Sequence, residues 1–88
     1  MSVELTGRSK THRPISKIAR EIRADWRRVN YAAEPYLQAM TQLNSVDEYV
    51  GYDDARGILI YFLVNATTWR GESARRIKTE LREIIDDR

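Results

Sequence analysis

One nine-residue pattern occurs twice in this 88-residue chain and strongly limits the structure that either segment can adopt. Residues 19–27 read AREIRADWR and residues 74–82 read ARRIKTELR, so both follow Ala-Arg-x-Ile-basic-x-acidic-apolar-Arg. At about 100° per residue, the three apolar residues of each copy fall on one side of a helix and the three cations on the other. Each segment is therefore predicted to be an amphipathic helix with one side in the core and a cationic side in solvent.

The cationic sides of these two helices form the candidate contact surface, with a Trp-Arg pair as an anchor at its edge. If the two sides meet in the folded domain they make one broad patch, which favours nucleic-acid binding; if they face apart, protein contact is favoured. The alternative is a plain solvated face, because ordinary surface helices show the same binary pattern. The candidate residues are Arg20, Arg23, Arg27, Trp69, Arg70, Arg75, Lys78 and Arg82.

Composition predicts one small folded domain. Hydrophobic residues make up 42% of the chain and charged residues 32%, with only four glycines and two prolines, which is typical of a helical globular protein. The chain has no cysteine, so it must fold by packing alone, as suits a reducing compartment. We expect residues 1–13 to be a flexible basic tail and residues 14–88 to be a single helical domain.

The apolar spacing predicts four helices, and hence an all-α fold with the shape of a compact bundle. The first is expected over residues 14–29, with Pro14 in its first turn. The second opens at Pro35 and ends before Asn44. The residues that follow are predicted to form a linker turn, and within them 49–52 is the one segment whose type is ambiguous.

The third and fourth helices are separated by a polar turn. Asp53 or Asp54 is expected to cap the third helix, which runs to about Ala66 and is apolar almost all round, so it should lie at the centre of the domain. Thr67 or Thr68 is expected to cap the fourth helix, whose core stripe extends to residue 85.

Charge is distributed unevenly along the chain. Residues 15–30 carry five cations against two carboxylates, whereas residues 31–56 carry five carboxylates against Arg56 alone. A basic front and an acidic middle would attract an anionic partner, or let two copies associate head to tail.

Residues suited to catalysis or metal binding are scarce. His12 is the single histidine and lies in the expected tail, where nothing holds a partner for it, and Ser73 has no histidine to activate it. The acidic residues of the middle segment lack the spacing of a calcium loop and are better explained as helix caps. We therefore expect no enzyme activity, no cofactor and no metal. The longest apolar run, Ile58–Val64, is too short to span a bilayer, so a cytoplasmic protein is expected.

Nucleic-acid binding is the alternative function. The third helix, the turn Thr67–Gly71 and the fourth helix have the outline of a helix-turn-helix, and their cations would supply counterion release. However, Glu72, Glu80 and Glu83 lie on the fourth helix and would repel phosphate.

Protein binding is the favoured function, because aromatic residues gather at the predicted element ends beside arginine, as at interface hot spots. Core filling is the competing explanation for each ring, while Trp69 is equally suited to be a lid on the core or an exposed anchor. We expect a protein partner, self-association included. The rings are Trp26, Tyr31, Tyr36, Tyr49, Tyr52, Tyr61 and Trp69.

Two phrases of the sequence, Tyr31–Met40 and Tyr61–Lys78, resemble small uncharacterised proteins encoded by actinobacteria and their bacteriophages. The likeness would cover about residues 15–85. It implies a cytoplasmic accessory protein, with phage origin as one alternative, and it assigns no role to any residue.

Overall fold

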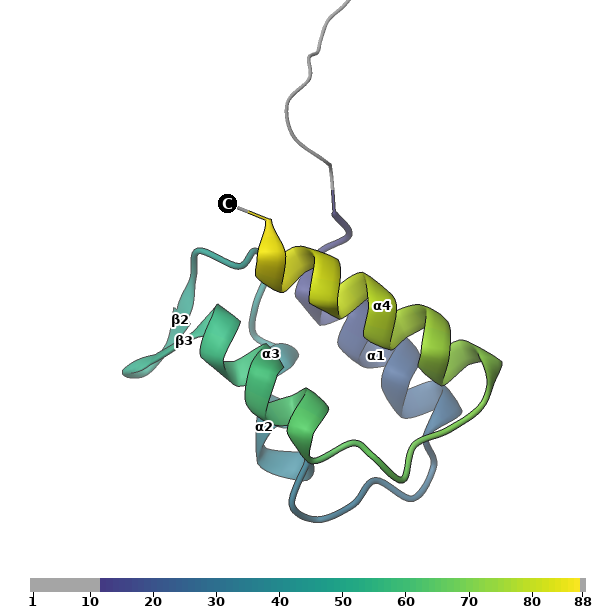
Figure 1. Ribbon diagram of the computed structural model, residues 1–88. Helices are drawn as coiled ribbons and strands as arrows, with labels where there is room; N and C mark the ends of the chain where they lie inside the picture. The colour runs from purple at the N-terminus through teal and green to yellow at the C-terminus, as the bar shows by residue number, and fades with distance from the viewer. Residues whose placement is uncertain (1–11, 88) are drawn as a thin grey trace, which may run out of the picture.

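The computed structural model describes residues 12–87, which form four helices and one short pair of strands (Figure 1). α1 packs against α2 and α4, and α3 packs against the same two helices, so the four helices close a ring around one core. The expectation of a compact and largely helical fold is confirmed, and one short pair of strands is added to the helices. The elements in order are α1 (Ile15–Asp25), α2 (Glu34–Met40), β2 (Tyr49–Val50), β3 (Asp53–Asp54), α3 (Ala55–Val64) and α4 (Glu72–Asp86).

The strands occupy the ambiguous segment. Tyr49 pairs with Asp54 and Val50 with Asp53 in an antiparallel hairpin, and Gly51 turns the chain with a φ of 63°. A positive φ at the turn favours glycine, which explains this residue, but aspartates are depleted in strands and two residues are too few to show alternation. The hairpin leads directly into α3, so it holds both carboxylates at the N-terminal end of that helix.

α1 follows its predicted apolar stripe but is shorter than expected. It ends at Asp25 rather than at residue 29, and Trp26 still reaches the core from the position after the helix. No side chain in the described part of the chain caps its start. Instead, the backbone N–H of Ile15 donates to the carbonyl of Asn44 at 3.2 Å, which satisfies one of the donors that a helix start leaves free.

The ends of α3 and α4 correct two predictions. Asp54 is the cap of α3, since its carboxylate accepts the backbone N–H of Gly57 at 3.2 Å, but the helix ends at Val64 instead of Ala66. α4 begins at Glu72 after Gly71, whose φ is 113°, so neither of the two threonines caps it. Only glycine adopts that φ readily, and this is why the chain can turn so sharply into α4.

The core is continuous and contains no charged side chain among the described residues. Each helix contributes its apolar stripe, as its spacing predicted, and both tryptophans are included. The bulkiest fully buried side chains are Ile15, Ile18, Ile22, Leu37, Met40, Leu43, Leu59, Phe62, Ile77, Leu81 and Ile84.

The expected flexible tail, residues 1–13, lies mostly outside the described residues, but its last two members contact the domain. Arg13 donates to both carboxylate oxygens of Glu80 at 2.9 and 2.7 Å, and these bonds raise its pKa. His12 Nε2 lies 2.9 Å from Asp87 Oδ2, so this histidine has a partner that the sequence did not indicate. Arg13 also pairs with Glu21 of α1, which ties α1 to α4.

Candidate functional site

The cations of α4 lie on two sides of that helix. Arg76 pairs with Glu21 of α1. The Lys78 ammonium instead donates to the backbone carbonyls of Ala66 and Trp69, at 2.8 and 2.7 Å, and so stands at the C-terminal end of α3. Residues three or four apart share a helix face, so the exposed Arg75 and Arg82 lie on the same side as Lys78, toward α3.

The cations of α1 point the other way. The Arg23 guanidinium donates to Glu34 of α2 at 3.1 and 2.6 Å, and this pairing raises the pKa of Arg23 and lowers that of Glu34. Arg20 lies three residues earlier on the same exposed side, and Arg27 is exposed beyond the helix end. Arg23 therefore reaches α2 whereas Lys78 reaches the end of α3, so these two cations do not lie together.

Trp69 is a lid on the core, not an exposed anchor. Its side chain is only 2% exposed, stacks on Trp26 with ring centroids 5.7 Å apart, and meets Phe62 edge to face. Its indole N–H donates to Asp25 at 2.8 Å, and the Lys78 ammonium lies 5.7 Å from the ring centroid. Of the proposed anchor pair, only the neighbouring Arg70 is exposed.

The Lys78 ammonium occupies a crowded cationic position. Its pKa is lowered first by burial and then by the nearby charges of Arg82 and Arg70. Of these three cations, Lys78 satisfies backbone carbonyls at the C-terminal end of α3, while Arg70 and Arg82 face solvent. Arg82 lies one turn further along α4, toward the end where Arg56 donates to the carbonyl of Ile85.

The most conspicuous apolar surface belongs to α3, which sequence reasoning assigned to the centre of the domain. Ile60, Tyr61 and Val64 are 43%, 57% and 63% exposed. We call these three residues the α3 face. α3 buries one side against the core and its flanks against α2 and α4, so the fourth side faces solvent even though it is apolar. The absence of any charged residue between positions 57 and 69 was the signal that could have revealed it.

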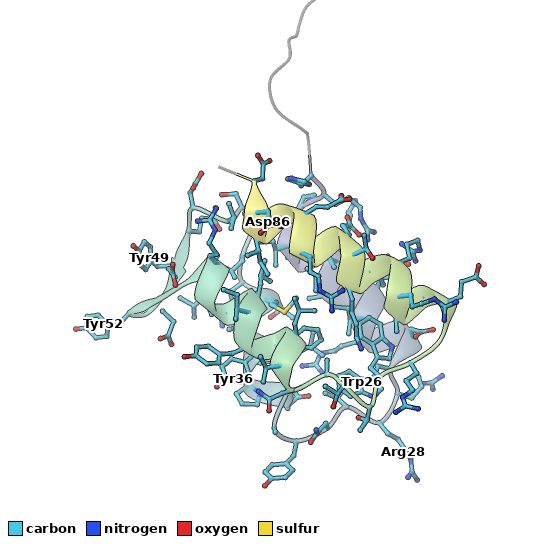
Figure 2. All side chains as sticks on the ribbon, in the orientation of Figure 1. Trp26, Arg28, Tyr36, Tyr49, Tyr52 and Asp86 are labelled. Atoms are coloured by element: carbon cyan, nitrogen blue, oxygen red, sulfur yellow. The ribbon has the colours of Figure 1, made fainter. Side chains whose placement is uncertain are left out.

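The hairpin at the N-terminal end of α3 carries further exposed aromatic side chains. Figure 2 shows the side chains of Tyr49 and Tyr52 projecting from the hairpin away from the domain. Within residues 12–87, five of the six large apolar side chains that are exposed lie on the hairpin or the α3 face, and the sixth is Tyr31. Core filling thus explains both tryptophans but not these tyrosines.

A hollow of about 210 Å³ lies where the hairpin meets α3. Two stacked rings form one wall, Tyr36 of α2 and Tyr61 of α3, with centroids 5.6 Å apart. Asp53 and Asp54 also line the hollow. Aromatic rings beside carboxylates are the surroundings that stabilise an organic cation.

No family model, curated protein or solved structure matches this chain. Residues 12–87 were also compared with the requirements of a metal site and of a membrane-spanning helix. Residues 12–87 hold no group of three or more side chains placed to bind a metal ion. In the same part of the chain, every helix is too short or too polar to cross a bilayer.

Proposed function

We propose that this protein is a cytoplasmic, non-enzymatic binding module that acts through protein–protein contact, with a second copy of the chain as its partner. The α3 face supports this proposal, because its three solvent-exposed positions are occupied by apolar side chains although polar residues would fit there equally well. Contiguous exposed apolar surface on a small domain marks an interaction site more often than scattered single residues do. The compact helical domain is then the scaffold that presents this helix.

Charge makes a second copy the best-fitting partner. The N-terminal end of α3 carries Asp53 and Asp54, and its C-terminal end lies beside the Lys78 ammonium and is followed by the exposed Arg70. One surface therefore carries both signs, separated by the apolar side chains. Two such surfaces are complementary when the helices run antiparallel, which is the arrangement that a two-fold axis produces.

The expected affinity is modest. Burying the exposed parts of Ile60, Tyr61 and Val64 is worth about 1 kcal/mol for each side chain, so the six in a dimer supply about 6 kcal/mol. Association costs at least about 4 kcal/mol, and the rest must come from the hairpin tyrosines and the charged ends. We expect a dissociation constant between about 1 μM and 1 mM.

Nucleic-acid binding through a helix-turn-helix-like arrangement is the alternative, and the contacts give it less support. Arg23 and Lys78 already have partners within the domain, Arg23 on α2 and Lys78 at the end of α3. The cations that this alternative would rely on are the exposed ones, namely Arg20, Arg27, Arg70, Arg75 and Arg82. Duplex DNA and RNA affinity at several salt concentrations, with Arg20→Glu/Arg75→Glu as control, tests it: salt-dependent binding that the control abolishes would replace the protein-contact proposal.

Sedimentation equilibrium between about 1 μM and 1 mM tests the proposed function. Wild-type protein should pass from monomer to dimer across this range. Val64→Glu should remain monomeric, because its carboxylate would be buried in the apolar contact. The matched control is Ala24→Glu, which adds the same group at an exposed position of α1 and should dimerise as wild type does. A wild-type chain that stays monomeric throughout would overturn the proposal.

A further inference from the structure

Two loops are fixed against each other at the end of the domain away from the hairpin (Figure 1). They are residues 26–33, between α1 and α2, and residues 65–71, between α3 and α4. The stack of Trp26 on Trp69 joins them, and an asparagine side chain of the first loop donates to a backbone carbonyl of the second at 3.3 Å. We call this pair of loops the loop end. Because both loops are anchored, their exposed side chains are held in a defined arrangement, which lowers the entropic cost of binding a partner.

The loop end carries three exposed arginines and neither an aspartate nor a glutamate. Within residues 12–87, no carboxylate lies within salt-bridge distance of any of the three. Asp25, Glu34 and Glu72 flank the loops, but the first accepts an indole N–H and the second pairs with an arginine of α1. Figure 2 shows the Arg28 side chain pointing away from the helices. The loop end therefore attracts an anionic partner. The three arginines are Arg27, Arg28 and Arg70.

Tyr31 adds an aromatic ring to these charges, three residues after Arg28. Its side chain is 89% exposed, and it lies in a turn that Asn30 closes. The side-chain oxygen of Asn30 accepts the backbone N–H of Ala32 at 3.1 Å, and its carbonyl accepts that of Ala33 at 2.8 Å. The ring is thus presented to solvent by a hydrogen-bonded turn. A solvated ring among arginines suits single-stranded nucleic acid, because a base stacks on the ring while the cations contact phosphates.

We propose that the loop end binds single-stranded nucleic acid, with one base stacked on Tyr31 and the three arginines on neighbouring phosphates. None of these side chains belongs to the α3 face, so the inference does not depend on dimerisation. It also differs from a helix-turn-helix arrangement, since unpaired bases are open to a ring on a loop and no helix has to enter a groove. The exposed Thr67 and Thr68 supply hydroxyls that can donate to the same backbone.

The salt dependence of binding tests the arginines. Fluorescence anisotropy would measure the affinity for labelled oligo(dT) and oligo(U) of about 12 nucleotides. Three phosphate contacts on a single strand predict a slope of log K against log salt of about −2, so raising NaCl from about 50 to 200 mM should weaken binding roughly 20-fold. Arg28→Ala should make this slope shallower by about 0.7. The matched control is Arg82→Ala, which lies about 15 Å along α4 from its start and should leave the slope unchanged.

Substitutions of Tyr31 test the stacked base. Tyr31→Ala should weaken binding of the single strand at least about fivefold, whereas Tyr31→Phe keeps the ring and should bind as wild type does. On a duplex of the same length, Tyr31→Ala and wild type should bind alike, because paired bases are not open to the ring. Circular dichroism should report unchanged helix content for every variant.

Three results would overturn the proposal. The first is no binding of the single strands at about 50 mM salt, or binding that neither Arg28→Ala nor Tyr31→Ala weakens. The second is an equal loss in Arg82→Ala, which would show that positive charge anywhere on the domain suffices. The third is displacement of the oligonucleotide by polyglutamate together with no effect of Tyr31→Ala, which would assign the loop end to an acidic protein. Sedimentation of the wild type measures dimerisation separately, so failure here leaves the proposed function standing.

Discussion

Lys78→Met tests whether this cation acts within the fold rather than as a contact residue. The ammonium donates to the carbonyls of Ala66 and Trp69, beyond the end of α3. Methionine keeps most of the length and packing of the side chain but provides no donor. The Trp69 carbonyl would then lose the ammonium, and the Ala66 carbonyl would keep only the backbone N–H of Trp69, so the turn that carries the Trp69 lid would lose its link to α4.

The magnitude follows from two opposing effects. Hydrogen bonds from a charged donor contribute about 1.5–3 kcal/mol each, so the two bonds contribute roughly 3–6 kcal/mol. Burial of the ammonium and repulsion by Arg82 and Arg70 offset part of this, as the lowered pKa of Lys78 shows. We expect a net loss of about 2 kcal/mol from an unfolding free energy of roughly 4–13 kcal/mol. For a domain of this size, that loss lowers the melting temperature by about 8–16 °C.

Urea and thermal unfolding followed by circular dichroism would measure this loss. The matched control is Arg82→Met, which removes a cation from the same side of α4 at an exposed position. It should change stability by no more than about 0.5 kcal/mol. Equal stability of the two variants would refute the role assigned to the ammonium and return Lys78 to the solvated cationic side.

Two further predictions concern contacts that hold the helices together. Trp69→Phe removes the indole N–H that donates to Asp25, and it should lower the free energy of unfolding in urea by about 2 kcal/mol. If the same substitution has an equal effect in a protein that already carries Asp25→Ala, the hydrogen bond contributes nothing. The pKa values of Glu21 and Glu34 are lowered by their arginine partners. Both carboxylates therefore stabilise the fold fully at pH values above the ordinary glutamate pKa of 4.5. This stabilisation is lost as the pH falls through the lowered pKa values. The urea concentration at the unfolding midpoint should therefore decrease as the pH is lowered below about 5. This decrease should be less steep in Glu21→Gln/Glu34→Gln, and identical pH profiles of the two proteins would contradict the prediction.

The helices could be predicted because their apolar residues recur at helical spacing over several turns. Ile15, Ile18 and Ile22 are buried on one side of α1, as their spacing required. The ends were harder to predict because they depend on distant residues. α1 stops at Asp25 although the stripe continues. Its first two N–H groups donate to the carbonyls of residues 44 and 43, which local sequence cannot reveal.

The candidate surface was predicted less well, for a physical reason. The spacing shows that Arg23 and Lys78 point away from their own core stripes, but not which neighbour each then meets. Arg23 meets Glu34 and Lys78 meets the end of α3, so both are largely occupied within the domain. The apolarity of α3 was equally ambiguous: it predicts burial, and in this domain one side of the helix remains uncovered because only two neighbours flank it.

Cysteine cross-linking at the α3 face tests the central claim most directly. The chain has no cysteine, so Val64→Cys and Ala24→Cys each introduce a single thiol, one on the proposed interface and one on exposed α1. A short bismaleimide reagent, added at a concentration where wild type is dimeric, should link two Val64→Cys chains covalently. Ala24→Cys should give little product under the same conditions. Equal yields from the two variants, or none from Val64→Cys, would show that two copies do not meet through α3.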